Sequence, residues 1–259
     1  MKIAVCVKQV PDTWAEKKLR SDDSRLDREA ADGVLNELDE YAVEQALQLT
    51  EAVGGEVVIV TMGPERAGET LRKAISMGAD AGIHIVDDNL AGSDAIATSA
   101  ALAKALEGRG FDLILFGSES TDARMSVIPA MIAERLSLPQ VTFAQKVDIS
   151  GTTLTAERVT DYGFDVLTAE LPAVVSVVEK INEPRYPSFK GIMAAKKKPV
   201  ETLSIGDLGL DASLVGASAA WSAVADFAAR PPKAAGVVVT DEGDGGTKIA
   251  DYLTSQKFI

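Results

Sequence analysis

Residues that build metal centres and disulfides are almost missing from this chain of 259 residues. It has one cysteine, Cys6, and one histidine, His84. A single cysteine excludes an internal disulfide framework, and the two side chains together are too few for a zinc or iron–sulfur site. The first apolar stretch, Lys2 to Lys8, is too short for a signal peptide and is expected to form a buried strand. We therefore expect a cytoplasmic protein without a metal centre.

Long hydrophobic runs and an excess of positive charge are missing as well. No apolar run approaches the roughly 20 residues that span a bilayer, so we expect no membrane-embedded segment. Lys and Arg number 26 against 39 Asp and Glu, and the net charge of −13 opposes nonspecific binding to nucleic-acid phosphates. The hydrophobic share of 46% excludes a mainly disordered chain.

Catalytic motifs are also missing. The sequence has no Gly-x-x-x-x-Gly-Lys-Ser/Thr loop and no Gly-x-Gly-x-x-Gly after the first strand. A Ser-His-Asp arrangement could use only His84, which lies inside a strand pattern. Cys6 is expected to be a small core residue, because nothing basic nearby in the sequence would activate its thiol. We interpret Asp22-Asp23 and Asp87-Asp88 as solvated loop charges, so the chain is expected to be no enzyme.

The residues that are present alternate between β-rich apolar runs and amphipathic stretches. This alternation is typical of parallel strands joined by crossover helices, with helices on both faces. The sequence thus predicts a doubly wound, mainly parallel α/β sheet of the Rossmann-like type. The predicted strands are Lys2 to Lys8, Glu56 to Met62, Ala81 to Val86 and Asp112 to Gly117. The predicted helices cover about 35–49, with Glu37, Glu40, Glu44 and Gln48 facing water, then 67–77, 93–107 capped by Ser93, and 125–136.

From about Val141 the apolar period changes toward two. Two short strands that flank Asp161-Tyr162-Gly163 predict a hairpin insertion, and another apolar strand follows. After Arg185, proline and glycine predict an irregular segment. We therefore expect an α/β nucleotide-binding domain over 1–205 and an extended C-terminal arm over 206–259, with a helix near Gly246 to Gln256. The strands predicted in this half are Thr153 to Val159, Asp165 to Ala169 and Leu171 to Glu179.

A ligand of such a sheet is expected outside the carboxyl ends of its strands, where the strand order reverses. This rule selects Cys6 to Pro11, Met62 to Pro64 and Gly117 to Ser126. In the last stretch, small hydroxyl-bearing residues leave a strand and open a helix. Backbone N–H groups there could hold a phosphate, aided by the helix dipole and by Arg124. The alternative is a plain helix cap by Ser120, Thr121 or Asp122.

Residues 180–198 form a basic segment in an acidic protein. A solvated run of charges is one interpretation. Large apolar side chains are interleaved with the lysines, however, without a helical or strand period, and such a composition is typical of a protein contact surface. The residues predicted to bind a partner are Tyr186, Phe189, Lys190, Ile192 and Met193.

The same segment carries a family resemblance. Asn182 to Tyr186, followed by Ile192 to Lys198, closely resembles the recognition-loop region of the electron-transfer flavoprotein beta subunit. Further similar motifs occur in the right order along the chain. They are Val5-x-Val7-Lys8-x-Val10, Asn36 with Ala42 to Ala46, Met77 to Asp80, Leu171 to Val175, and Gly206 to Gly209.

The resemblance implies an adenine-nucleotide-binding fold in a heterodimer whose alpha subunit binds FAD. This subunit would hold a structural AMP and recruit acyl-CoA dehydrogenases, with a quinone oxidoreductase as electron acceptor. Thr13 and Leu38 would lie near the flavin, and Phe189 would replace the usual leucine anchor. The implied nucleotide-binding residues are Cys6, Asn36, Glu37, Leu38, Asp39, Met62, Ser118, Glu119, Ser120, Thr121, Asp122, Ala123, Arg124, Met125, Ser126, Val127, Ile128 and Pro129.

The loop Ala123 to Pro129 departs from its relatives. Bifurcating relatives bind a second FAD in place of AMP and usually have a Gly-Asp-Thr stretch in this loop, which is absent here. Its absence favours AMP. Two alternatives stay open from the sequence: a bifurcating subunit with its own FAD, and an adenine-nucleotide hydrolase or ligase on the same fold.

Overall fold

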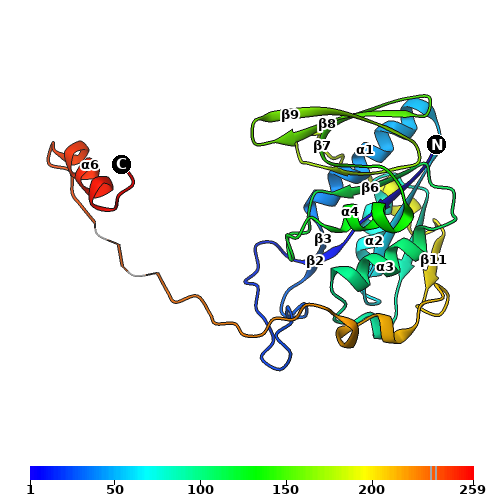
Figure 1. Ribbon diagram of the computed structural model, residues 1–259, viewed down its shortest axis with the longest axis horizontal. Helices are drawn as coiled ribbons and strands as arrows, with labels where there is room; N and C mark the ends of the chain where they lie inside the picture. Colours follow the sequence, from blue (N-terminus) through cyan, green and yellow to red (C-terminus); the bar gives the residue numbers. More distant parts are fainter. Residues whose placement is uncertain (234, 237) are drawn as a thin grey trace. The chain divides into compact units, whose positions relative to one another are not determined.

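The computed structural model describes residues 1–233, 235–236 and 238–259. The chain divides into two compact units, Met1–Ala225 and Asp226–Ile259. The first unit contains the large sheet and its helices (Figure 1).

The sheet of the first unit has nine strands in the order β11-β5-β4-β1-β6-β10-β7-β8-β9. Strands β11 to β7 in this order are parallel, and β8 and β9 continue the sheet antiparallel. The predicted α/β fold with a mainly parallel sheet is therefore confirmed. The strand bounds are β1 Lys2–Cys6, β4 Glu56–Met62, β5 Ala81–Ile85, β6 Leu113–Gly117, β7 Gln140–Ser150, β8 Thr153–Thr160, β9 Gly163–Glu170, β10 Ala173–Val177 and β11 Val200–Leu203, and β2 Gln9–Pro11 pairs with β3 Gly33–Leu35 apart from this sheet.

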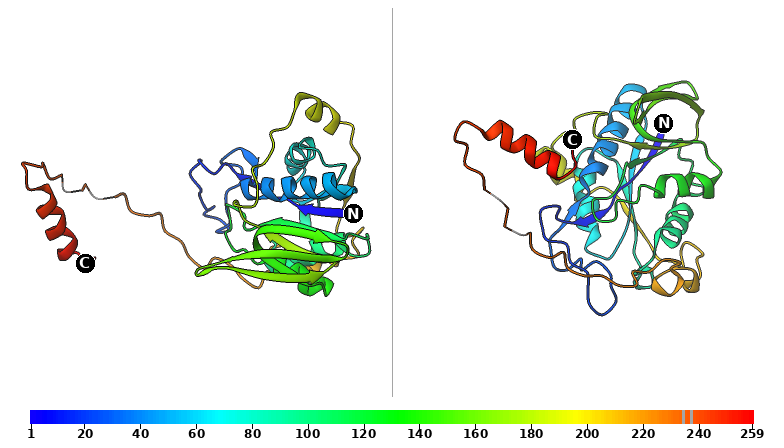
Figure 2. Two further views of the ribbon diagram at one scale, coloured as in Figure 1. Left: turned by 90° about the horizontal axis from the view of Figure 1, so that it is seen from above. Right: turned by 60° about the vertical axis from the view of Figure 1, so that its left-hand side comes forward.

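Strand β1 is the point at which the order of the sheet reverses. It pairs with β4 on one side and with β6 on the other. Its side chains alternate between two apolar clusters: Ile3 and Val5 pack with α1 and α2, and Ala4 and Cys6 pack with α3 and α4. Helices therefore cover both faces, as Figure 2 shows. The helix bounds are α1 Glu37–Val53, α2 Ala67–Ser76, α3 Ala95–Leu106, α4 Ile128–Leu136 and α5 Phe189–Ala195, with short 3-10 turns at Asp88–Leu90, Ala212–Leu214 and Ala217–Ala219.

Two helices begin later than the sequence predicts. The cap of α3 is Asp94, whose side chain accepts a hydrogen bond from the Ala97 N–H at 3.0 Å, and Ser93 instead accepts one from the Gly216 N–H at 2.8 Å. Helix α4 begins at Ile128, because Arg124 and Ser126 have φ angles of 51° and 56°. Left-handed backbone cannot continue a right-handed helix, so the predicted start near residue 125 is wrong.

The hairpin insertion is confirmed. Thr160 pairs with Gly163, which leaves Asp161 and Tyr162 as a two-residue loop between β8 and β9. Leu154 and Ala156 of β8 are buried and extend the core on the α1 side of the sheet.

The prediction of an irregular segment after Arg185 is wrong. Residues 189–195 form α5, which Ser188 caps by accepting a hydrogen bond from the Gly191 N–H at 3.0 Å. A Cβ at Gly191 would stand 2.5 Å from the carbonyl oxygen of Ser76, so the glycine permits close packing on α2. Seven residues are too few to show a helical period in sequence. Strand β11 follows and pairs with β5, although the sequence predicts no strand there.

The expected arm belongs to both units. Residues 206–225 lie in the first unit, where the Ala217 N–H binds the Ala91 carbonyl and the Trp221 N–H binds the Asp94 carboxylate at 2.8 Å. The second unit contains α6, Gly245–Ser255, which confirms the predicted terminal helix. Over the described ranges, every helix is too short or too polar to cross a membrane.

Candidate functional site

A cavity of about 300 Å³ lies at the carboxyl ends of β1, β4 and β6. Its position is the reversal point of the strand order, where open α/β sheets bind their ligands. Many of the residues expected at a nucleotide site line this cavity: Cys6, Asp39, Met62, Ser120, Ala123, Met125, Ser126, Val127, Ile128 and Pro129. Val7, Lys8 and Gly117, which lie in the stretches that the strand-end rule selects, also line it. The lining further includes residues that the sequence did not single out for this role: Arg28, Ser93, Asp94, Ala95, Thr98, Leu102 and Phe116.

Other expected nucleotide-site residues do not line the cavity. Asn36 is buried and holds the loop after β6, since its side chain donates to the Glu119 carbonyl at 2.9 Å and accepts from the Thr121 N–H at 3.1 Å. Arg124 is exposed. The expected residues that do not line the cavity are Asn36, Glu37, Leu38, Ser118, Glu119, Thr121, Asp122 and Arg124.

The loop of residues 118–127 has the donors that an anion requires. Left-handed residues at Arg124 and Ser126 turn the backbone sharply, and such turns can direct successive N–H groups into one concavity. Helix α4 follows without a side-chain cap, so its first N–H groups have no capping side chain. The buried Thr121 hydroxyl has no hydrogen-bond partner within the described residues, but Thr121 does not line the cavity. The turned loop and the uncapped helix start fit a phosphate group.

Asp39 places a carboxyl group in the wall of the cavity. Burial raises the pKa of Asp39 to about 7, although hydrogen bonds from Asn36 and from the Lys8 and Gly117 N–H groups oppose this shift. The Lys8 N–H lies 2.8 Å from a carboxylate oxygen of Asp39. A Cβ at Gly117 would stand 2.6 Å from Asp39 Oδ1, so only glycine leaves room here.

Cys6 lines the same cavity as a buried thiol. Burial, together with the charge of Asp39, raises the pKa of Cys6. A thiol with a raised pKa stays protonated and is a poor nucleophile. The structure thus agrees with the expectation that Cys6 is a small core residue.

A charged cluster joins three segments beside the cavity. Asp122 has a fully buried side chain and pairs with Lys8 Nζ at 2.9 Å and with Arg28 Nη2 at 2.6 Å. Burial by itself would raise the pKa of Asp122, but the charges of Lys8 and Arg28 lower it to about 2. In the same segment as Arg28, Lys17 donates to the Thr121 carbonyl at 3.0 Å. Sequence reasoning missed Arg28 because it lies 94 residues from Asp122 in a stretch without a motif.

The residues expected near the flavin, Thr13 and Leu38, are both partly buried. The Thr13 hydroxyl has no hydrogen-bond partner within the described part of the chain. The Leu38 carbonyl lies beside Gly117. Neither residue lines the cavity, and their role toward a flavin stays a prediction.

The predicted partner-binding residues form an exposed apolar surface, which we call the recognition segment, residues 186–193. Tyr186 is 96% exposed and Phe189 is 81% exposed, and Ile192 and Met193 are exposed on α5. Lys190 is exposed between them. Exposed apolar side chains gathered in this way are typical of a contact surface, and the partner-binding role stays a prediction.

Charged side chains hold both ends of the recognition segment. Before it, Arg185 binds Glu44 at 2.7 Å and Glu51 at 2.6 Å, both on α1. The prediction that Glu44 faces water is wrong, because Arg185 covers it and leaves its side chain 5% exposed. After the segment, Arg72 of α2 donates to the Ala195 and Lys198 carbonyls, each at 2.6 Å.

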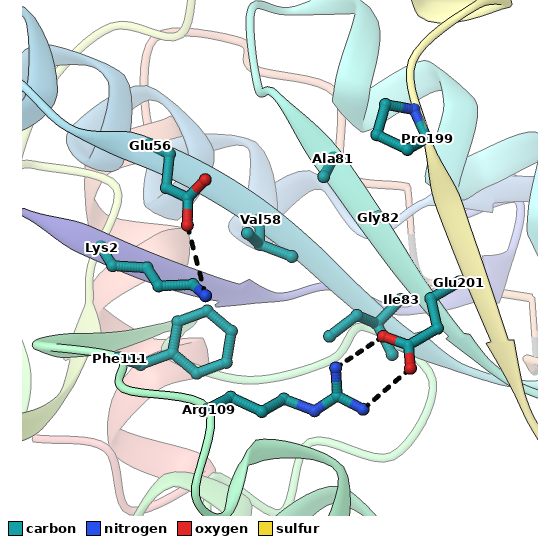
Figure 3. A pocket seen from close by; sticks show the side chains of 10 residues that line it. All are labelled: Lys2, Glu56, Val58, Ala81, Gly82, Ile83, Arg109, Phe111, Pro199 and Glu201. Carbon is teal, nitrogen blue, oxygen red and sulfur yellow. Dashed lines mark hydrogen bonds and ion pairs between the residues drawn. The ribbon is translucent and has the colours of Figure 1, made fainter.

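A second cavity, of about 360 Å³, lies at the amino ends of β1, β4 and β5 (Figure 3). Its charges are already paired: Lys2 with Glu56 at 3.3 Å, and Arg109 with Glu201 at 2.5 Å. The Lys2 ammonium also lies 5.1 Å from the centre of the Phe111 ring. None of the residues expected at a functional site lines this cavity, so it makes the weaker candidate.

The sequence of the chain is similar to a known protein family. The Electron transfer flavoprotein domain matches residues 24–208. The chain is 53% identical to the electron transfer flavoprotein subunit beta of Mycobacterium tuberculosis (strain ATCC 25618 / H37Rv), over 99% of each chain. The chain belongs to the electron transfer flavoprotein family, as a beta subunit.

More distant beta subunits of the family also match. The chain is 40% identical to that of Syntrophomonas wolfei over 98% of this chain and 96% of the relative. It is 38% identical to that of Bacillus subtilis over 82% of each chain. The cavity loop at 118–127 and the recognition segment both lie inside the residues that the family domain matches.

Proposed function

We propose that the chain is the non-catalytic subunit of a heterodimeric electron carrier. It supports the FAD that an alpha subunit binds, keeps one AMP in the cavity at the end of β1, and recruits acyl-CoA dehydrogenases through the recognition segment. A quinone oxidoreductase then accepts the electrons for the respiratory chain. Fatty acid oxidation in the cytoplasm is the setting that this proposal implies.

The cavity at the reversal point of the sheet is the observation that carries the AMP assignment. Its volume of about 300 Å³ is at the lower end of the range for ligand sites, which suits a mononucleotide better than FAD, a molecule that contains AMP as one of its two halves. The uncapped start of α4, whose residues Ile128 and Pro129 line the cavity, supplies donors for a phosphate.

The experiment is the identification and counting of nucleotides released from the purified heterodimer, by mass spectrometry. We expect one AMP and one FAD per heterodimer. Two FAD and no AMP would establish the bifurcating alternative instead. The absence of any adenine nucleotide besides one FAD would contradict the AMP assignment.

A hydrolase or ligase is less well supported. Within the described residues, no group of three or more His, Cys, Asp or Glu could hold a metal ion, and Cys6 is protonated. Turnover of ATP by the heterodimer would support this alternative, and we expect none.

A further inference from the structure

The cavity lining contains charges of both signs. The carboxylate of Asp94 caps α3 and already accepts hydrogen bonds from the Ala97 and Trp221 N–H groups, at 3.0 and 2.8 Å. Lys8 and Arg28 are the only cations among the described residues that line the cavity. An anion in the cavity is therefore repelled by Asp94 and attracted by Lys8 and Arg28.

The single carboxylate of Asp122 does not neutralise both cations. Two cations face one carboxylate, whose side chain is fully buried, while the side chains of Lys8 and Arg28 stay 38% and 39% exposed. Both cations line the cavity and Asp122 does not, so the net positive charge of the cluster is presented to the cavity. The other nearby carboxyl group, Asp39, is not fully ionised at neutral pH because burial raises its pKa to about 7.

We propose that Lys8 and Arg28 bind the phosphate of the nucleotide and make the cavity selective for a nucleoside monophosphate over the uncharged nucleoside. This inference rests on the AMP-binding function proposed above. Arg28 supplies a planar fork of donors suited to phosphate oxygens, and Lys8 supplies a point charge. The base and ribose then lie toward the apolar part of the lining, which includes Leu102, Phe116 and Ile128.

Neither residue belongs to the loop that the family resemblance points to. Lys8 follows β1, and Arg28 lies in the irregular segment between β2 and β3. Through Arg28, a segment distant in sequence thus becomes part of the phosphate site. The exposed Arg124, which the sequence favoured for this role, does not line the cavity.

The test compares AMP with adenosine on the heterodimer after its AMP has been removed, using titration calorimetry. For the wild type we expect AMP to bind more tightly than adenosine. In Arg28→Gln we expect the affinity for AMP to fall about tenfold to a hundredfold, as for the loss of a charge-assisted hydrogen bond, and that for adenosine to stay unchanged. Lys8→Gln should act in the same direction, and Arg28→Lys should restore part of the preference.

Arg25→Gln is the matched control. Arg25 lies in the same segment but pairs with Asp23 at 2.5 Å and does not line the cavity, so both affinities should stay at the wild-type value. The variant Asp122→Asn separates phosphate binding from a structural role. It removes the carboxylate that competes for the two cations, and we expect the preference for AMP over adenosine to rise.

Each outcome bears on the inference. If Arg28→Gln weakens AMP and adenosine equally, or if Asp122→Asn lowers the preference for AMP, Lys8 and Arg28 only hold the loop and the inference is overturned. An unchanged preference in Arg28→Gln overturns it as well, while wild-type binding of AMP keeps the proposed function intact. A wild-type heterodimer that binds neither compound removes the proposed AMP function, and the inference with it.

Discussion

The cavity and the recognition segment use charge in opposite ways. At the cavity, polar and charged side chains such as Asp39 and Asp122 are buried, and the apolar core lies behind them. In the recognition segment, Tyr186 and Phe189 are exposed, and ion pairs such as that of Arg185 with Glu44 lie beneath the ends of the segment. The difference fits the two proposed functions: a site for a small charged ligand places its charge inside, whereas a site for a protein places its apolar side chains outside and uses charge to position them.

The largest effect expected concerns the buried charge of the cavity. The folded-state pKa of Asp39 is about 7, while in the unfolded chain Asp39 titrates near its ordinary value, about 3.9. The folded state therefore holds the proton more tightly, and ionisation of Asp39 lowers the free energy of unfolding progressively from about pH 4 to about pH 7. The full loss amounts to roughly 4 kcal/mol.

The variant Asp39→Asn removes this pH dependence, because its amide does not ionise. We expect the difference in free energy of unfolding between pH 5 and pH 8 to shrink relative to the wild type. Urea titration of the heterodimer at fixed protein and nucleotide concentrations measures it. Asp94→Asn is the control, since Asp94 also lines the cavity but hydrogen bonds lower its pKa. An unchanged slope in Asp39→Asn would show that this carboxyl group is ionised in the folded state.

The cavity also illustrates how far sequence reasoning reaches. The strand pattern and the reversal rule select Cys6 and Met62, because ligand sites in parallel sheets follow from topology. The rule also selects the stretch that contains Lys8, but it does not predict the pairing of Lys8 with Asp122, and it does not select Arg28. These pairings span 114 and 94 residues, and that of Arg28 depends on the path of an irregular segment.

Sequence patterns also predict only part of the recognition segment. Its apolar composition alone predicts Tyr186 and Phe189 as contact residues, and both are exposed in the structure. The helical period of α1, in contrast, predicts that Glu44 faces water. This prediction fails because Arg185, 141 residues away in the sequence, covers Glu44, and a local period contains no information on such a distant residue. Long-range ion pairs are the part of both sites that a local pattern does not contain.

The second effect tests the exposed apolar side chains. We expect Phe189→Ala to slow reduction of the heterodimer by acyl-CoA dehydrogenases about thirtyfold to a hundredfold, as for an interface anchor worth about 2 to 3 kcal/mol. Stopped-flow measurement of flavin reduction gives the rate. AMP and FAD contents should not change, because the side chain is 81% exposed and remote from the cavity lining.

Tyr162→Ala is the matched control for this variant. Tyr162 is an aromatic residue that is 82% exposed at the turn between β8 and β9, outside the recognition segment. Its removal should leave the reduction rate unchanged. Equal rates for Phe189→Ala and the wild type would reject the anchor role.

A third, smaller effect concerns the charges that hold the recognition segment. Glu44→Gln breaks a partly buried ion pair with Arg185, whose side chain is 35% exposed, so solvent screening limits the loss to about 1 kcal/mol. We expect faster hydrogen exchange in residues 185–195 and a reduction rate lowered about threefold to fivefold. Glu40 lies on the same helix as Glu44 and pairs with Lys73 of α2, so Glu40→Gln should change neither quantity. Unchanged exchange in Glu44→Gln would mean that packing alone fixes the segment.

The smallest effect separates steering from binding. Lys196 and Lys197 are exposed beside the recognition segment, and each can attract an acidic partner only through solvent. Their joint replacement by glutamine should lower the association rate less than about threefold at physiological ionic strength, and the difference should vanish at high salt because exposed charges are screened there. The reduction rate is measured at several salt concentrations for the lysine variant and for Phe189→Ala. The lower rate of Phe189→Ala should persist at high salt, because this variant removes an apolar contact that is buried in the complex. If the lysine variant instead lost as much activity as Phe189→Ala at every salt concentration, the lysines would bind the partner directly, and charge would serve both regions in the same way.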